Sequence, residues 1–220
     1  MGLSRLASLL AVGLCCTTVL AAAGDDLDSW IALGHAELAP GGSAKRAAAA
    51  FERAWKAAPD RTDLLGWYTF ALAEDGQYER AVAILRSTLL ESANPEDLTS
   101  GRYYLQRIAE REVLGLANSG KHEDALARIA SYLAAGAPAD TELAKSLTAM
   151  KPQIERELVA RRCADGYNAG IRAANEQKFA EARPHFEKVV AECAATDAAL
   201  AARAQETLAE IAKFDKKRKR

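Results

Sequence analysis

The 220-residue chain has little of several things that many folds and sites depend on. Aromatic residues make up only 6% of it, and β-branched residues form few runs after residue 25, whereas alanine is abundant. Because alanine is the best helix former and lets helices approach closely, this composition predicts an almost purely helical protein. An excess of charge of one sign is also lacking, since the net charge is −1. This balance argues against a dedicated nucleic-acid binder.

Motifs that carry catalysis are missing as well. The chain has no G-x-S-x-G, no H-E-x-x-H and no phosphate-binding glycine loop. Its three histidines, at positions 35, 122 and 185, are scattered, and none has a second histidine or a paired carboxylate at metal-ligand spacing. The sequence therefore predicts a protein that is not an enzyme and has neither a cofactor nor a metal site. An enzyme of unrecognised type is the alternative.

The first 23 residues have the organisation of a secretory signal peptide. A short basic start ends at Arg5, an apolar run follows from Leu6 to Leu20, and three alanines precede Gly24. We expect cleavage after Ala23 and a periplasmic or secreted protein of bacterial type. The alternative is an uncleaved membrane anchor formed by residues 6–23, since that run is nearly long enough to span a bilayer.

A helical hairpin is predicted over residues 62–95. An apolar helix pattern runs into Gly76, restarts at Tyr78 and stops near Pro95. Glycine can adopt the left-handed conformation that ends a helix, and proline cannot continue one. Residues 27–59 show the same organisation, so the hairpin is repeated.

These hairpins resemble tetratricopeptide (TPR) repeats, in which the first helix of each hairpin is called helix A and the second helix B. In such a repeat, helix B carries a small residue followed four positions later by a bulky apolar one. Four such pairs occur: Ala47 with Phe51, Ala81 with Leu85, Ala125 with Ile129, and Ala182 with Phe186. The first two small residues are 34 positions apart, which is the TPR period. The next two intervals are longer, which leaves room for a long helix over residues 95–118 and an extra helix between residues 139 and 151.

The resemblance implies an all-α, right-handed α-solenoid of about four TPR-like helical hairpins with extra helices, within residues 24–214. In the fourth hairpin, Asn175 and Glu176 replace the turn glycine, since asparagine tolerates the left-handed conformation. Pro152 is expected to mark a helix boundary or to be a first-turn proline of the next helix. Residues 197–214 are expected to form a C-terminal capping helix, which a solenoid needs over its last seam.

Two cysteines follow residue 24, Cys163 and Cys193. In the repeat register they stand at the start of helix A and the end of helix B of one hairpin, and antiparallel helices bring these ends together. A disulfide is therefore geometrically possible, and it suits an oxidising exported compartment. Two small buried thiols are the alternative.

TPR arrays similar to this one bind extended peptides or partner helices on the concave face lined by helix A, so a protein or peptide partner is expected and no nucleic acid. Carried over through the repeat register, the candidate partner-binding residues are Asp28, Ile31, His35, Asp63, Phe70, Glu74, Arg107, Glu110, Leu114, Tyr167, Ile171 and Asn175. For each of them the alternative is an ordinary surface residue, and for His35 it is a partly buried helix histidine.

The chain ends in a basic tail, residues 215–220, whose last five residues are all lysine or arginine. Such a cluster can contact anionic envelope components weakly, or it can be a solvated tail. The function that these observations favour is a non-catalytic protein–protein interaction scaffold in the cell envelope. The alternative is an envelope-associated structural protein that docks through its tail.

Overall fold

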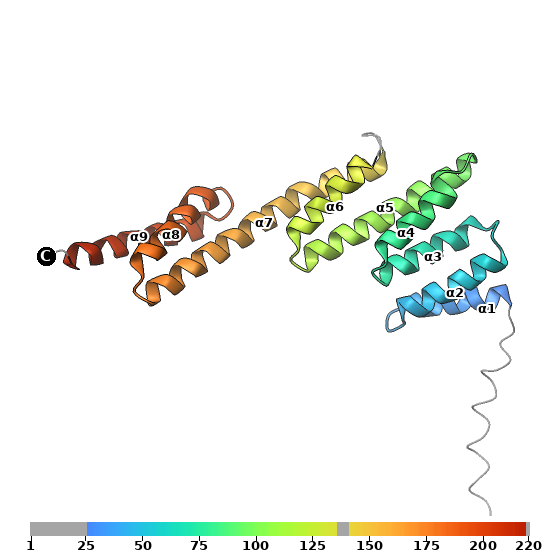
Figure 1. Cartoon of the computed structure of the whole chain (residues 1–220), viewed down its shortest axis with the longest axis horizontal. Coiled ribbons are helices and arrows are strands. Elements are labelled where there is room, and N and C mark those ends of the chain that lie inside the picture. Colours follow the sequence, from blue (N-terminus) through green and yellow to red (C-terminus); the bar gives the residue numbers. More distant parts are fainter. Residues whose placement is uncertain (1–25, 136–140, 219–220) are drawn as a thin grey trace, which may run out of the picture. The chain divides into compact units, whose positions relative to one another are not determined.

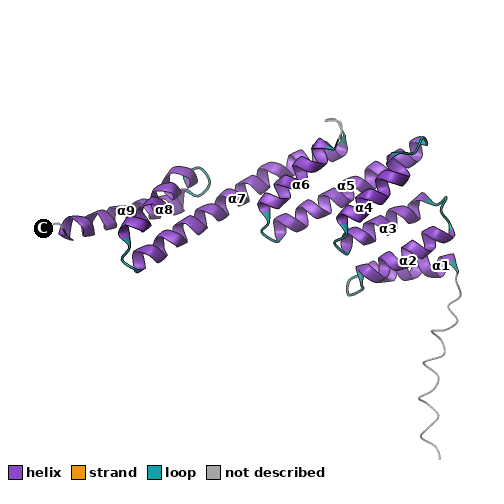
Figure 2. Cartoon of the chain, in the orientation of Figure 1, coloured by secondary structure: helices purple, strands orange, loops and turns teal. Residues whose placement is uncertain are grey.

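The structure is a computed structural model that describes residues 26–135 and 141–218, with side chains as far as Phe214 (Figure 1). Within these ranges the regular structure consists of nine α-helices and one π-helical segment, with no strand (Figure 2). The predicted all-α, TPR-like helical repeat array is therefore confirmed. The expected signal peptide, residues 1–23, lies outside the described residues.

Two compact units make up the chain, and the boundary between them falls inside helix α5, after Arg111. Unit 1 contains α1 (Leu27–Leu38), α2 (Ala44–Ala57), α3 (Thr62–Glu74), α4 (Tyr78–Leu85), the π-helical segment η1 (Arg86–Leu90) and the first part of α5 (Pro95–Asn118). The pairs α1–α2 and α3–α4 are the two hairpins predicted over residues 27–59 and 62–95. The start and the end of α5 agree with the long helix expected over residues 95–118.

Unit 2 contains the rest of α5, α6 (His122–Ala134), α7 (Glu142–Asn175), α8 (Phe179–Cys193) and α9 (Ala198–Arg218). The terminal helix expected over residues 197–214 is present as α9, and it continues into the basic tail. Its first turn is capped by Asp197, whose Oδ1 accepts a hydrogen bond from the backbone N–H of Leu200 at 2.9 Å.

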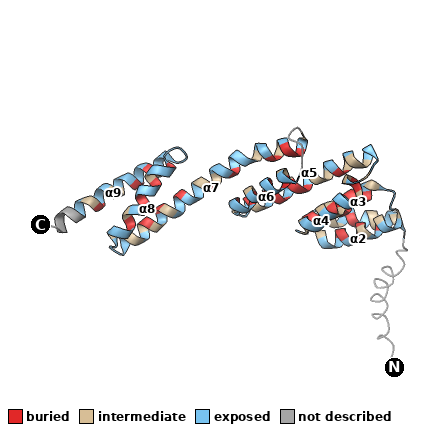
Figure 3. Ribbon diagram, turned by 45° about the horizontal axis from the view of Figure 1, so that its top comes forward, coloured by how far each residue is buried: buried red, intermediate tan, exposed pale blue. Residues whose placement is uncertain are grey.

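Small residues in helix B lie where the sequence pattern predicts close helix crossings. Ala47, Ala81 and Ala182 are fully buried, as are the bulky residues Phe51 and Phe186 that follow two of them. Buried residues occur among exposed ones in the helices of both units (Figure 3). Alanines at these crossings have only a methyl side chain, which lets the helices approach closely, so the repeat pattern is a packing pattern.

Glycines in helix A complete this packing in both units. A Cβ atom on Gly34 would meet the ring of Phe51 at 2.6 Å, and one on Gly170 would meet the ring of Phe186 at 2.8 Å. Real Cβ atoms essentially never come this close to another atom. The phenylalanine of helix B therefore occupies the space that glycine leaves on helix A.

Three turns between paired helices use the same hydrogen bonds. The residue in the left-handed conformation is Gly76 (φ 78°), Gly120 (φ 77°) or Gln177 (φ 60°). Each donates its N–H to the carbonyl three residues back, and the next residue donates to the carbonyl five residues back, as in the Schellman motif. The expectation that Asn175 and Glu176 replace the turn glycine is wrong: Asn175 is still helical, and Gln177 takes the glycine position.

Replacing Gln177 with glycine should raise the free energy of unfolding of unit 2 by about 0.5–1 kcal/mol. A side chain in the left-handed conformation costs roughly 1–2 kcal/mol, and the greater freedom of glycine in the unfolded chain offsets part of the gain. Urea titration followed by circular dichroism measures the difference. Gln177→Ala is the matched control, because it keeps the Cβ atom; an equal gain from alanine would rule out backbone strain as the cause.

The separate helix expected between residues 139 and 151 does not exist. Helix α7 runs without interruption from Glu142 to Asn175, with Pro152 inside it, so the expected boundary at this proline is wrong. Leu147 and Ile154 are buried on either side of the proline. Their burial against neighbouring helices offsets the backbone hydrogen bond that proline cannot make.

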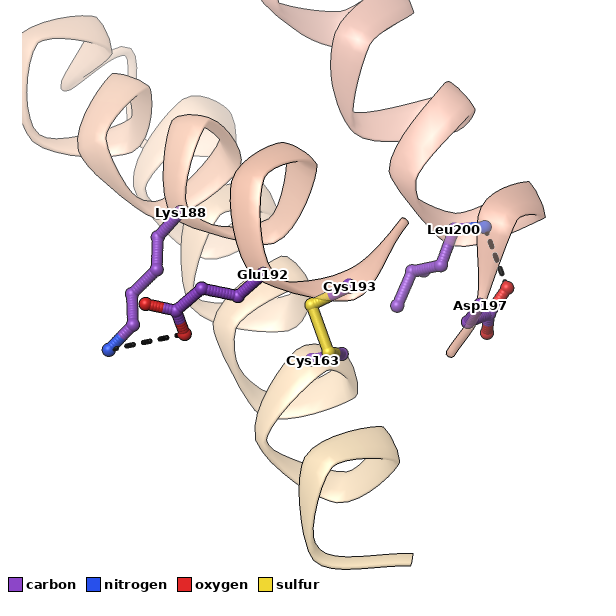
Figure 4. Close-up of a disulfide and its surroundings, with 6 residues drawn as sticks. All are labelled: Cys163, Lys188, Glu192, Cys193, Asp197 and Leu200. Atoms are coloured by element: carbon purple, nitrogen blue, oxygen red, sulfur yellow. Dashed lines mark hydrogen bonds and ion pairs between the residues drawn. A yellow bond between two sulfur atoms is a disulfide. The ribbon is translucent and has the colours of Figure 1, made fainter. Parts of the chain in front are cut away.

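A disulfide ties α7 to α8. The Sγ atoms of Cys163 and Cys193 lie 2.02 Å apart, and both residues are buried (Figure 4). Cys193 is the last residue of α8, as the repeat register expects, but Cys163 lies in the middle of α7 rather than at the start of a helix. The bridge encloses a loop with a sequence separation of 30 residues.

Candidate functional site

Unit 1 carries a group of aromatic rings on its helix A residues. The ring of His35 from α1 meets the ring of Trp67 from α3 edge-on, with 4.6 Å between centroids, and Trp67 meets Phe70 at 6.2 Å. Phe51 lies beneath them, 5.1 Å from His35 and 5.9 Å from Trp67. We call His35, Trp67 and Phe70 the aromatic patch.

The aromatic patch is accessible although its base is buried. Phe51 is 0% exposed and holds the rings from below, whereas Trp67 is 37% exposed, His35 is exposed and Phe70 is half-buried. Trp67 and Phe70 are three residues apart and so share one face of α3. Large rigid rings of this kind, supported by a packed core, are the side chains that most often anchor a protein partner.

A hollow of about 350 Å³ lies beside the patch, where α3 passes the turn between α1 and α2. Its lining consists of Glu37, Leu38, Ala39, Gly42, Ala44, Phe70 and Glu74. Phe70 therefore belongs both to the aromatic patch and to the hollow, which makes the two features one continuous surface.

Both carboxylates of the hollow are held by arginines. Glu37 pairs with Arg46 at 2.9 Å and accepts the backbone N–H of Ser43 at 2.9 Å. The Arg46 hydrogen bond, with smaller help from Ser43, holds the pKa of Glu37 below its ordinary value. Glu74 pairs with Arg111 of α5 at 2.7 Å. Both glutamates are thus held in position by an ion pair.

The other end of α3 carries a second charged group. Arg61 binds Asp63 through two hydrogen bonds, of 3.1 and 2.6 Å, and this guanidinium holds the pKa of Asp63 below its ordinary value. Nearby, the ring of Tyr104 from α5 fills the space that a Cβ atom on Gly66 would take. Burial, followed by the charge of Asp63, raises the pKa of the Tyr104 hydroxyl.

The structure brings most of the predicted partner-binding residues of unit 1 to the surface. Asp28, His35, Asp63 and Arg107 are exposed, and Ile31, Phe70, Glu74 and Glu110 are half-buried. Sequence reasoning missed Trp67 and Arg111. Trp67 follows Asp63 by four residues and precedes Phe70 by three, so its helical spacing alone places it on the same face.

In unit 2 the predicted residues do not form an equivalent patch. Leu114 and Asn175 are exposed and Ile171 is half-buried. Tyr167 is only 9% exposed, because its ring packs against Phe186 at 5.5 Å and lies under the guanidinium of Arg203. Tyr167 therefore belongs to the core of unit 2 and offers little surface to a partner.

Among residues 26–135 and 141–218, no group of three or more histidine, cysteine, aspartate or glutamate side chains is placed to hold a metal ion. In the same residues, none of the helices combines the length and the apolar character that a membrane crossing needs.

Comparison with known proteins identifies one part of the chain. Residues 41–99 match the family model described as tetratricopeptide repeat, which covers α2, α3, α4, η1 and the start of α5. No curated protein and no solved structure matches the chain. TPR domains are generally non-enzymatic and bind proteins or peptides, so the match supports a protein–protein interaction scaffold with a protein or peptide partner.

Proposed function

We propose that this protein is a non-catalytic scaffold of the cell envelope that holds a peptide segment of a protein partner against the aromatic patch of unit 1. The observation that carries the proposal is the accessible cluster of His35, Trp67 and Phe70 on buried Phe51. These rings lie on helix A residues, the part of a TPR-like array where the sequence resemblance implies peptide binding. No cofactor is needed, since shape and side-chain complementarity provide the affinity.

The proposed location is the periplasm, reached through the signal peptide expected at residues 1–23. The sequence organisation of those residues supports it, and the disulfide of unit 2 suits an oxidising compartment. Fractionation of cells that express the whole chain tests the location. Uncleaved protein in the cytoplasm would contradict it.

A second candidate is docking on an anionic surface through the basic tail, residues 215–220. Phe214, the last residue with a described side chain, is 59% exposed and stacks on Phe179 at 5.8 Å, and only Asp215 separates this apolar ring from the basic residues 216–220. Exposed aromatic and basic side chains together are typical of contacts with anionic lipid surfaces.

Replacing Trp67 with alanine should weaken peptide binding at least about tenfold, because a supported tryptophan at the centre of an interface typically contributes 2 kcal/mol or more. The peptides come from selection of a random displayed library on the wild-type chain, and fluorescence anisotropy then gives their dissociation constants. Phe214→Ala is the matched control: it removes an exposed aromatic ring from the other unit and should leave the affinity unchanged.

The outcomes separate the two candidates. Loss of binding in Trp67→Ala together with full binding after deletion of residues 215–220 supports the aromatic patch. Unchanged binding in Trp67→Ala would overturn it. If the deletion alone abolishes attachment to anionic vesicles, and no selected peptide depends on Trp67, the tail is the functional contact.

A further inference from the structure

The lining of the hollow beside the aromatic patch combines apolar side chains with two acidic ones. Leu38 and Phe70 provide the apolar surface, and the charged side chains in its lining are Glu37 and Glu74. No lysine or arginine belongs to the lining, although Arg46 and Arg111 hold the carboxylates from outside. A ligand group that enters the hollow therefore contacts both apolar surface and negative charge.

Glu74 keeps acceptor capacity for such a group. Its Oε2 atom binds Arg111 at 2.7 Å, and in the part of the chain that the structure describes its Oε1 atom accepts no hydrogen bond. A carboxylate has about four acceptor positions, so one arginine does not saturate it. Arg111 also fixes the orientation of Glu74, so that little rotamer freedom is lost when a second donor binds.

The charge of unit 1 favours a cationic ligand beyond the hollow itself. Residues 26–111 carry 13 acidic and 10 basic side chains. At the far end of α3, Asp28 lies close enough to influence Arg61, so acidic groups border both ends of the surface. A net negative unit attracts cationic segments and raises their rate of encounter.

From this geometry we infer that the hollow binds a lysine or arginine side chain of the partner, while a neighbouring apolar residue of the same segment packs on Trp67. The inference rests on the proposed function and names its partner class: a cationic peptide in which one basic residue stands next to a bulky apolar residue. The aliphatic stem of the basic side chain lies against Leu38 and Phe70, and its charged head lies between Glu37 and Glu74. Amphipathic basic side chains suit such a site, because stem and head have different requirements.

The experiment uses peptides selected on the wild-type chain and resynthesised with citrulline in place of one arginine. Citrulline keeps the shape of arginine and removes its charge. The citrulline peptide should bind about tenfold more weakly to the wild type, since a hydrogen bond to a charged group typically contributes 1.5 kcal/mol or more. Glu74→Gln should weaken the arginine peptide by a similar factor and leave the citrulline peptide unchanged.

Two further variants serve as a repeat and as a control for this test. Glu37→Gln repeats the comparison of the two peptides at the other carboxylate of the hollow, in case loss of the ion pair with Arg111 disturbs α3 in Glu74→Gln. Glu91→Gln removes the same charge from an exposed residue of unit 1 outside the hollow, and it should still bind the arginine peptide about tenfold more tightly than the citrulline peptide, as the wild type does. Equal affinity of the two peptides for the wild type, or equal discrimination by all three variants, would overturn the basic-residue pocket while peptide binding at Trp67 stands. If no peptide depends on Trp67, the proposed function itself fails.

Discussion

Replacing Phe51 with alanine should lower the free energy of unfolding of unit 1 by about 3–5 kcal/mol, the usual cost of removing a fully buried phenylalanine. Phe51 is 0% exposed and lies in the core cluster of unit 1 with Leu65, Tyr68 and Leu72. Its ring also fills the space over Gly34. The cavity cannot collapse without bringing α1 and α2 closer together, so little of the loss can be recovered.

Tryptophan emission isolates this effect, because all three tryptophans of the chain, at positions 30, 55 and 67, belong to unit 1. A urea titration that follows their emission reports the unfolding of unit 1 alone. Phe214→Ala removes the same side chain from unit 2, at a position 59% exposed, and should leave the unfolding midpoint of unit 1 unchanged. A loss below about 2 kcal/mol for Phe51→Ala would mean that the site repacks.

The same substitution links stability to the proposed site. Phe51 contacts both His35 and Trp67, so its removal takes away the support under the aromatic patch. Where folded protein remains at low temperature, we expect Phe51→Ala to bind peptide more weakly than the wild type although no surface ring has been deleted. The patch is therefore a product of the same small-and-bulky packing that builds the hairpin.

The packing positions could be predicted because one physical requirement repeats along the chain. Helix crossings need a small residue and the gap beside them needs a bulky one, and the sequence shows both at fixed spacing. Ala47, Ala81 and Ala182 are all fully buried. The turn after α3 could be predicted for a similar reason, since only glycine adopts the conformation of Gly76 without cost.

The errors occurred where tertiary packing outweighs a local signal. Pro152 is a helix breaker by its chemistry, yet α7 passes through it because Leu143, Leu147, Ile154 and Leu158 are buried on both sides. Their spacing of four, seven and four residues continues one helical stripe across the proline. That stripe is visible in the sequence, and its burial outweighs the effect of a single proline.

The candidate site was less predictable than the fold. The repeat register predicts which face of its helix a residue occupies, but it does not predict which side chains of other helices contact that residue. Register placed Tyr167 on a binding surface, whereas the contacts with Phe186 and Arg203 bury it. Register also left out Trp67, the ring at the centre of the aromatic patch. Which rings gather depends on contacts between α1 and α3, and no spacing within one helix contains that information.

Removing the disulfide should lower the free energy of unfolding of unit 2 by about 3 kcal/mol. The bridge between Cys163 and Cys193 encloses a loop with a sequence separation of 30 residues, and closing such a loop reduces the entropy of the unfolded chain by about this amount. Both cysteines pack in one cluster with Phe186 and Val189, so the bridge also keeps α7 and α8 in register around the core.

The measurement is a urea titration of residues 24–220 by circular dichroism, with and without dithiothreitol, beside the double variant Cys163→Ala/Cys193→Ala. Reductant should destabilise the wild type and have no effect on the variant, which lacks any thiol. Tryptophan emission, which reports unit 1, should keep its midpoint in every sample, because the bridge and its core lie in unit 2. A wild type that reductant leaves unchanged would mean that the thiols are not bridged in solution, and the argument for an oxidising compartment would lose its structural support.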